Sequence, residues 1–142
     1  MAAVNYQLTG AVTLLLQHGA DPNLPSPLTG ETPLHIAALR GFADGSTECA
    51  ELLLDAGANP NVTTNVDVVT PSMASGTTVI GETPLHWAAA FGSQRLIKLL
   101  INAGADKSAT DARGDTPLIW YGRHQRTTPH ILVEHGTRDL LD

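Results

Sequence analysis

Six histidines are the side chains in this sequence best suited to metal binding or to general acid–base chemistry. His124, His130 and His135 gather near the C-terminal end, but gaps of six and five residues do not place them on one helix face. No cysteine or carboxylate completes a zinc-like spacing with them. His35 and His86 occupy the same place in two copies of a repeated string. We therefore expect no metal site and no cofactor.

Other groups that could do chemistry lack the neighbours that chemistry needs. Cys49, the single cysteine, lies in an apolar-rich run without a flanking cation, which is typical of a buried, unreactive thiol. No nucleophile elbow, zinc-protease motif or phosphate-binding glycine loop is present in the sequence. We therefore expect no catalytic residues and do not expect an enzyme.

Length and charge narrow the class of protein further. The 142 residues suit one domain, and with 4% aromatic residues its core must be filled by small and aliphatic side chains. The net charge of −6 repels phosphates, which argues against nucleic acid and anionic membranes as partners. No apolar run reaches the length of a membrane helix, and the first residues do not resemble a signal peptide. We expect a cytoplasmic location.

Two strings recur along the chain. GETPLHIAALRG begins at Gly30, GETPLHWAAAFG begins at Gly81, and the weaker copy GDTPLIWYGRH begins at Gly114. The second string reads LLLQHGADPN, LLLDAGANPN and LLINAGADKS, and a degraded copy follows near the C-terminal end. The interval from Thr83 to Thr116 is 33 residues. A fixed period of this length indicates a stack of similar units.

These strings resemble the ankyrin repeat, which has this period and the signature T-P-L-H-x-A. The resemblance covers nearly the whole chain and implies an all-α fold, an ankyrin-repeat solenoid of stacked helix-turn-helix units with hairpin-like connecting loops. The residue types agree, because each Thr-Pro pair can cap and begin a first helix. We expect Gly41 and Gly92 to end that helix in a left-handed conformation, and Gly19, Gly57 and Gly104 to end the second helix.

The resemblance also implies roles for single residues. It implies that His35 and His86 bridge backbone groups of neighbouring loops and that Asp111 ties its turn to its neighbour, so that Asp111 and Asp115 are no acid–base pair. Trp87 and Trp120 occupy a position that is usually internal. Asn23 and Asn61 sit where family members are hydroxylated by an asparaginyl oxygenase, so being such a substrate is an alternative function.

Departures from the period divide the chain into unequal parts. About four extra residues, around Ala43 to Ser46, separate the helices of the first full repeat. Fourteen more enlarge the next loop, and their Thr and Val content favours a hairpin-like insertion with a loose tip, here called the finger. We expect the finger to be dispensable for folding. The predicted parts are a half repeat at 1–27, repeats at 28–62 and 80–111, the finger at 63–79 and a C-terminal capping repeat at 112–142.

Ankyrin stacks usually bind protein partners through loop tips and exposed positions of the first helices. The resemblance therefore implies a protein–protein interaction module that uses its concave face and the finger. Phe91 is the expected aromatic contact, unless it folds back under the finger. The residues implied to bind the partner are Thr29, Glu31, Leu39, Arg40, Ile80, Glu82, Ala90, Phe91, Ala112, Arg113, Asp115, Arg123 and His124.

The N-terminal part has room for a second helix but not for a complete first one. The usual partner of Leu14 to Leu16 would then precede Met1, so we expect Val4, Leu8 and Val12 to be partly exposed. An exposed apolar strip favours association. The sequence therefore predicts weak self-association through this end, or a chain that is a fragment of a larger ankyrin-repeat protein.

Overall fold

The computed structural model describes residues 1–41, 46–73, 76–127 and 136–142, with the backbone alone at 125–127. The chain forms eight described helices and one two-stranded sheet. Their bounds are α1 Ala2–Asn5, α2 Thr9–Gln17, α3 Pro33–Leu39, α4 Ser46–Asp55, β1 Val66–Val69, β2 Thr78–Ile80, α5 Pro84–Phe91, α6 Gln94–Asn102, α7 Pro117–Thr127 and α8 Thr137–Leu141.

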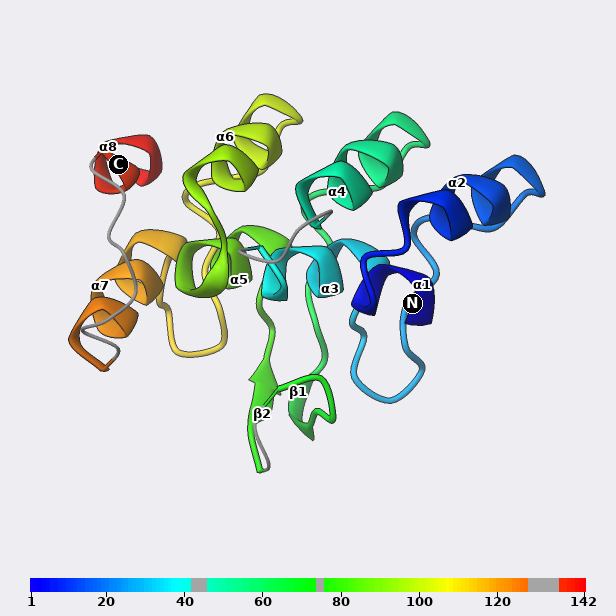
Figure 1. Ribbon diagram of the computed structural model, residues 1–142. Coiled ribbons are helices and arrows are strands. Elements are labelled where there is room, and N and C mark those ends of the chain that lie inside the picture. The colour runs from blue at the N-terminus through cyan, green and yellow to red at the C-terminus, as the bar shows by residue number, and fades with distance from the viewer. Residues whose placement is uncertain (42–45, 74–75, 128–135) are drawn as a thin grey trace.

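The helices stack in two rows, as Figure 1 shows. The inner row consists of the first helices α1, α3, α5 and α7, and the outer row consists of the second helices α2, α4, α6 and α8. The finger projects from the side of the inner row that faces away from the outer row. The all-α solenoid expected from the sequence is confirmed, with the small sheet confined to the finger.

The inner helices begin as their sequence dictates. In α3 and α5 the residue before the helix is a threonine in extended conformation, and a proline fills the first helical position. The Thr32 and Thr83 side chains each pair with the backbone three residues on, and the His35 and His86 side chains pair back to the threonine backbone. These reciprocal caps fix the orientation of each histidine ring.

Small residues let the repeats approach closely. Ala37, Ala38 and Ala88 are fully buried within the stack. A Cβ added to Gly41 would come within 2.3 Å of the Cα of Gly92, so no other residue fits there. The left-handed conformation expected at these two glycines is wrong, since neither has a positive φ. Gly41 is required for contact between neighbouring repeats, whereas a Cβ on Gly92 would collide with the Ala88 backbone of its own helix, α5.

The glycines that follow the second helices do behave as expected. Gly19, Gly57 and Gly104 have φ values of 83°, 93° and 93°, which lie in the left-handed region. The outer helices bury Leu53, Leu96 and other aliphatic side chains against the inner row. Burying one such side chain contributes about 1.5–3 kcal/mol, so the core rests on aliphatic packing between the two rows.

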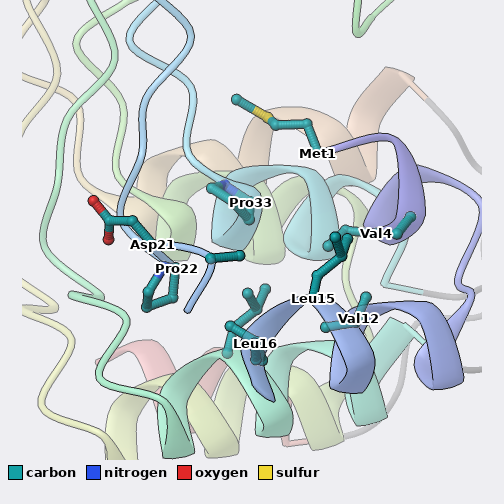
Figure 2. A pocket seen from close by; sticks show the side chains of 11 residues that line it. Met1, Val4, Val12, Leu15, Leu16, Asp21, Pro22 and Pro33 are labelled. Carbon is teal, nitrogen blue, oxygen red and sulfur yellow. The ribbon is translucent and has the colours of Figure 1, made fainter. Parts of the chain in front are cut away.

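The N-terminal end differs from the expectation. The four-residue helix α1 covers part of α2, so Val4 and Val12 are each only 3% exposed, and the expected exposure of these two residues is wrong. Leu8 is 52% exposed, as expected, and Leu14 and Leu15 are also exposed. Figure 2 shows the apolar hollow that remains between α1 and α2, with Leu15 and Leu16 on one side.

The finger is a short antiparallel hairpin. Val66 pairs with Ile80, Val68 with Val79, and Val69 with Thr78, with an irregularity between Val66 and Val68. Pro71 and Gly76 lie toward its tip, whereas Ser75 lies outside the described residues, as do residues 43–45 of the other expected insertion. Thr64 and Val79 are buried at the base of the hairpin, and Thr70, within the part from Val66 to Thr78, is buried as well.

Among the described residues, no helix is both long enough and apolar enough to cross a membrane.

Candidate protein-binding face

Two histidines join neighbouring loops along the inner row. The Nδ1 atom of His35 accepts a hydrogen bond from the Thr32 backbone N–H at 3.1 Å, so Nε2 carries the proton. Nε2 then donates to the Glu82 carbonyl oxygen at 3.0 Å. His86 repeats this arrangement with Thr83 and with the Asp115 carbonyl oxygen. The bridging role implied for both histidines is confirmed.

Burial keeps both imidazoles neutral. Desolvation lowers the pKa of His35 to about 4, although its hydrogen bond to the Glu82 carbonyl opposes the shift. Desolvation also lowers the pKa of His86, against the hydrogen bond to Asp115 and the nearby carboxylates of Asp111, Glu82 and Asp115. Neutral, fully hydrogen-bonded rings of this kind are structural and are not poised for acid–base chemistry.

Asp111 ties its own turn together and fixes a tryptophan. Its Oδ1 atom accepts hydrogen bonds from the backbone N–H groups of Arg113 and Asp115, and Oδ2 accepts from the Trp120 indole at 2.9 Å. Burial alone would raise the pKa of Asp111, but these hydrogen bonds outweigh it and the net pKa is lowered. Asp111 is therefore a structural carboxylate, and it orients Trp120 on the inner face.

Two buried glutamates fasten the finger to the stack. Glu31 accepts hydrogen bonds from the hydroxyls of Thr70 and Ser72 in the finger, the latter at 2.8 Å. Glu82 accepts from the Thr64 hydroxyl at 2.5 Å and from the Ile80 backbone N–H at 2.8 Å. Buried carboxylates are costly without hydrogen bonds, so these contacts set where the hairpin leaves the stack.

The residues expected to bind a partner divide into three groups by burial. The exposed ones are Arg40, Ala112, Arg113 and Arg123, and the half-buried ones are Leu39, Phe91 and His124. The buried ones are Thr29, Glu31, Ile80, Glu82, Ala90 and Asp115. In this structure the buried group supports the face from beneath, and only the exposed and half-buried residues can touch a partner with their side chains.

The loop residues of the expected set link one repeat to the next. The Thr29 carbonyl accepts a hydrogen bond from the Asn65 backbone N–H at 2.8 Å, and the Ile80 carbonyl accepts one from Ala112 at 2.8 Å. Asp115 forms an ion pair with Arg123. These backbone links hold the loop tips in one continuous row along the inner face.

An aromatic cluster lies at the α5–α7 end of the face. The Phe91 ring meets the His124 ring edge to face, with centroids 4.8 Å apart, and His124 stacks on Trp120 at 5.9 Å. Phe91 and Met73 line the same hollow, which has a volume of about 370 Å³. Phe91 thus stands beside the finger, half-buried, and is neither fully exposed nor covered. Trp87 is fully buried, as expected, whereas Trp120 is half-buried.

The finger separates this hollow from a second one. The second hollow, of about 290 Å³, lies between the finger and the α1–α3 end and includes Asn5, Arg40 and Ser72 in its lining. The Arg40 Nε–H donates to Asn5 Oδ1 at 3.1 Å. Asn5, Met73 and the threonines that hold the glutamates were not expected from the sequence. The sequence did offer one signal for the contacts of the glutamates: a Glu precedes each of the first two Thr-Pro pairs, and the insertion between these pairs is rich in hydroxyl side chains.

Asn23 and Asn61 are held between outer loops. The Asn23 amide donates to the Gly57 carbonyl at 3.0 Å and accepts from the Asn59 backbone N–H at 2.6 Å. Asn61 does the same with Gly104 and Asp106. Both asparagines therefore join successive repeats through backbone groups.

The other groups considered for chemistry show structural surroundings. Cys49 is fully buried, and burial, followed by the charge of Glu48, raises the pKa of its thiol. The described residues hold no group of three or more metal-binding side chains, and His130 and His135 lie outside them. The face is thus a surface of fixed loops, hollows and rings with no assembled reactive group among the described residues.

Known proteins with similar sequences share the repeat. The chain matches the ankyrin repeat family over residues 29–65 and 80–112, and the family of ankyrin repeats in many copies over residues 3–44. Human SH3 and multiple ankyrin repeat domains protein 2 is 33% identical over 140 residues, covering 96% of this chain. Human neurogenic locus notch homolog protein 4 is 38% identical over 77% of the chain, and the mouse B-cell lymphoma 3 protein homolog is 32% identical over 82%.

The matched region is a small part of each relative. The chain spans 7%, 5% and 22% of the lengths of these three proteins. Ankyrin repeats generally serve as non-enzymatic scaffolds for protein–protein interaction. The repeated strings, the two rows of helices and the histidine bridges agree with these matches, and the chain belongs to the ankyrin-repeat family.

Proposed function

We propose that this protein–protein interaction module binds its partner through the inner face, with the finger as a central contact. The observation that carries the proposal is the fixed position of the finger between two hollows. Glu31 and Glu82 tie the finger to the stack through buried hydrogen bonds. A surface that is ordered before binding loses less conformational entropy on association, which favours affinity.

The exposed cations on this face support a protein partner. Arg40 stands beside one hollow, and Arg113 stands beside the other. Arginine and aromatic side chains are enriched at the centres of protein interfaces, and this face carries Phe91 and Trp120 next to Arg113. The outer helices instead expose ion pairs of Arg95 with Glu48 and Glu51.

Site-specific photo-crosslinking tests the proposal. A photoreactive residue replaces Arg40 or Arg113 on the inner face, and Lys98 on α6 serves as the matched control because it is an exposed cation of the outer row. In extract of the source organism, the two inner positions should capture the same protein and the control should not. Capture of that protein from Lys98 alone would overturn the proposal.

A second contact involves the N-terminal end. Leu8, Leu14 and Leu15 are exposed, and Leu15 also lines the small apolar hollow of Figure 2. A strip of this kind favours weak self-association of two copies, which buries the leucines. Sedimentation at increasing concentration should show association that is lost when Leu8 and Leu15 are changed to Lys. A strictly monomeric chain at high concentration would exclude it.

The alternative role as a hydroxylation substrate rests on Asn61, whose side chain is exposed between two outer loops. Mass spectrometry of protein from the native source would then show one added oxygen atom on that residue. An unmodified peptide removes this alternative and leaves the binding proposal untouched.

A further inference from the structure

The hollow between the finger and the α5–α7 end has the chemistry of a peptide-binding pocket. Its volume of about 370 Å³ falls within the range of ligand pockets in proteins. Its walls come from three parts of the chain: Met73 in the finger, Phe91 in α5, and Trp120 and His124 in α7. Walls from three elements form a site that can enclose one side chain of a peptide segment.

The ring side of the pocket is fixed before any ligand arrives. The Trp120 indole N–H is held by Asp111 at 2.9 Å, and the His124 ring is hydrogen bonded to the Trp120 carbonyl at 3.2 Å. His124 in turn meets Phe91 edge to face at 4.8 Å. Aromatic pairs of this geometry are favourable beyond their buried area, so a large apolar side chain that entered here would extend an existing cluster.

The charged groups around the pocket differ in whether they have a partner within the protein. The carboxylates of Glu82, Asp111 and Asp115 all have hydrogen-bond donors within the protein, and Asp115 is also paired with Arg123. The guanidinium of Arg113 is exposed and has no acceptor among the described residues. The three carboxylates keep their negative charges but are buried and already hydrogen bonded, so the Arg113 guanidinium is the exposed charge at the mouth of the pocket that remains available for an ion pair.

We propose that this pocket binds an acidic peptide segment of the partner: a large apolar side chain enters against Phe91 and Trp120, and a neighbouring carboxylate pairs with Arg113. The proposal rests on the function proposed above and adds the chemistry of the ligand. Arginine binds carboxylates through two parallel hydrogen bonds, which gives the contact both charge and direction.

Selection from a random peptide display library on the intact chain tests the chemistry directly. The enriched peptides should share Phe, Trp, Leu or Met next to Asp or Glu. A synthetic copy of an enriched peptide should change the fluorescence of half-buried Trp120, while Trp87 is buried within the stack. No enrichment, or enrichment of basic peptides, overturns the proposal.

Single substitutions then test whether the peptide binds in this pocket and not elsewhere on the face. Arg113→Glu should weaken the peptide by about tenfold or more, Phe91→Ala by a similar factor, and Lys98→Glu should leave the affinity within about twofold. Peptides that tolerate both pocket changes but are lost on shortening the finger would reject the pocket and retain the proposed function. Crosslinking of the partner to the outer row alone would reject the function itself.

Discussion

The inner helices of the middle repeat and the last repeat both begin with a Thr-Pro pair, but the loops ahead of them are held by different chemistry. In the last repeat, Asp111 accepts hydrogen bonds from two backbone N–H groups and from the Trp120 indole. In the middle repeat, Thr64 stands in the equivalent place, since its N–H bonds to the Glu82 carbonyl as that of Asp111 bonds to Asp115. The Thr64 hydroxyl accepts from the Gly81 and Glu82 backbone N–H groups and donates to the Glu82 carboxylate.

Because threonine stands at residue 64 where the last repeat has Asp111, one tryptophan lacks a hydrogen-bond partner. Trp87 is the counterpart of Trp120, yet its Nε1–H is the one buried side-chain polar atom without a partner among the described residues. Leaving such a group unpaired costs about 1–3 kcal/mol. Burying about 150–250 Å² of a tryptophan contributes about 4–6 kcal/mol at the usual coefficient, so the core position is still favourable.

The difference lies at the base of the finger. Glu82 lies where the hairpin returns to the stack, and its carboxylate needs a hydroxyl donor at residue 64. An aspartate there would bring two carboxylates together without the arginine that pairs with Asp115 in the last repeat. Threonine avoids this contact and leaves the Trp87 indole unpaired. The residue at position 64 thus affects both the attachment of the finger and the hydrogen bonding of the core tryptophan Trp87.

Thr64→Asp should have the largest effect on stability. The new carboxylate would lie against the buried Glu82 carboxylate, which should lower the free energy of unfolding by about 3–5 kcal/mol at pH 7. Urea denaturation measures the loss. Adding Glu82→Gln should restore most of it, because the repulsion is removed and Trp87 gains an acceptor. A single variant as stable as the parent would contradict the comparison.

On acidification, the two bridging histidines should become protonated at different pH values. The folded-state pKa of His35 is lowered from 6.5 to about 4, so its neutral form stabilises the fold fully above pH 6.5, and this contribution is lost as the pH falls toward 4. The loss should reach about 3 kcal/mol for this group. We expect His86 to titrate at higher pH, because three carboxylates oppose its burial. Histidine resonances followed by NMR would refute this if His35 titrates near 6.5.

Asp111→Thr should convert the last repeat to the chemistry of the middle one. The threonine hydroxyl can still accept the backbone N–H groups, but the Trp120 indole loses its acceptor. The expected loss is about 1–2 kcal/mol, smaller if water reaches the half-buried ring. In a double-mutant cycle with Trp120→Phe, the double variant should lose less stability than the sum of the two single losses. Strictly additive effects would show that the hydrogen bond contributes nothing.

Arg123→Ala should have the smallest effect. Its ion pair with Asp115 is partly exposed, so the free energy of unfolding should fall by less than about 1 kcal/mol, and by less still at high salt. Thermal melts in low and high salt measure the difference. A salt-independent loss of several kcal/mol would mean that this pair, and not the loop hydrogen bonds, holds the last repeat.

The parts of the fold that depend on local strings were predictable. The caps at Thr32 and Thr83 and the turn glycines after the outer helices follow from nearby residues alone. The histidine bridges reach carbonyl groups of the next repeat, and only the family resemblance implied them. The requirement for Gly41 was not predictable, because it arises from contact between two repeats. The short α1 helix also escaped prediction, since four residues carry too little periodicity.

The candidate face was only partly predictable for the same reason. Glu31 and Glu82 occupy positions that bind partners in the family, but here the finger supplies hydroxyls that bury both. The partners of Glu31 lie about 40 residues further along the chain. Arg113 and Phe91 remained accessible, because no residue of the insertion packs over them completely.

Shortening the finger tests the central claim most directly. Replacing residues 66–78 with a Gly-Asn turn keeps buried Thr64 and Val79 and exposes Glu31 to water, so the helical circular dichroism spectrum should be unchanged. Binding of the protein captured from Arg40 and Arg113 should weaken by about tenfold or more, since both hollows lose a wall. Full binding by a well-folded shortened chain would contradict the account.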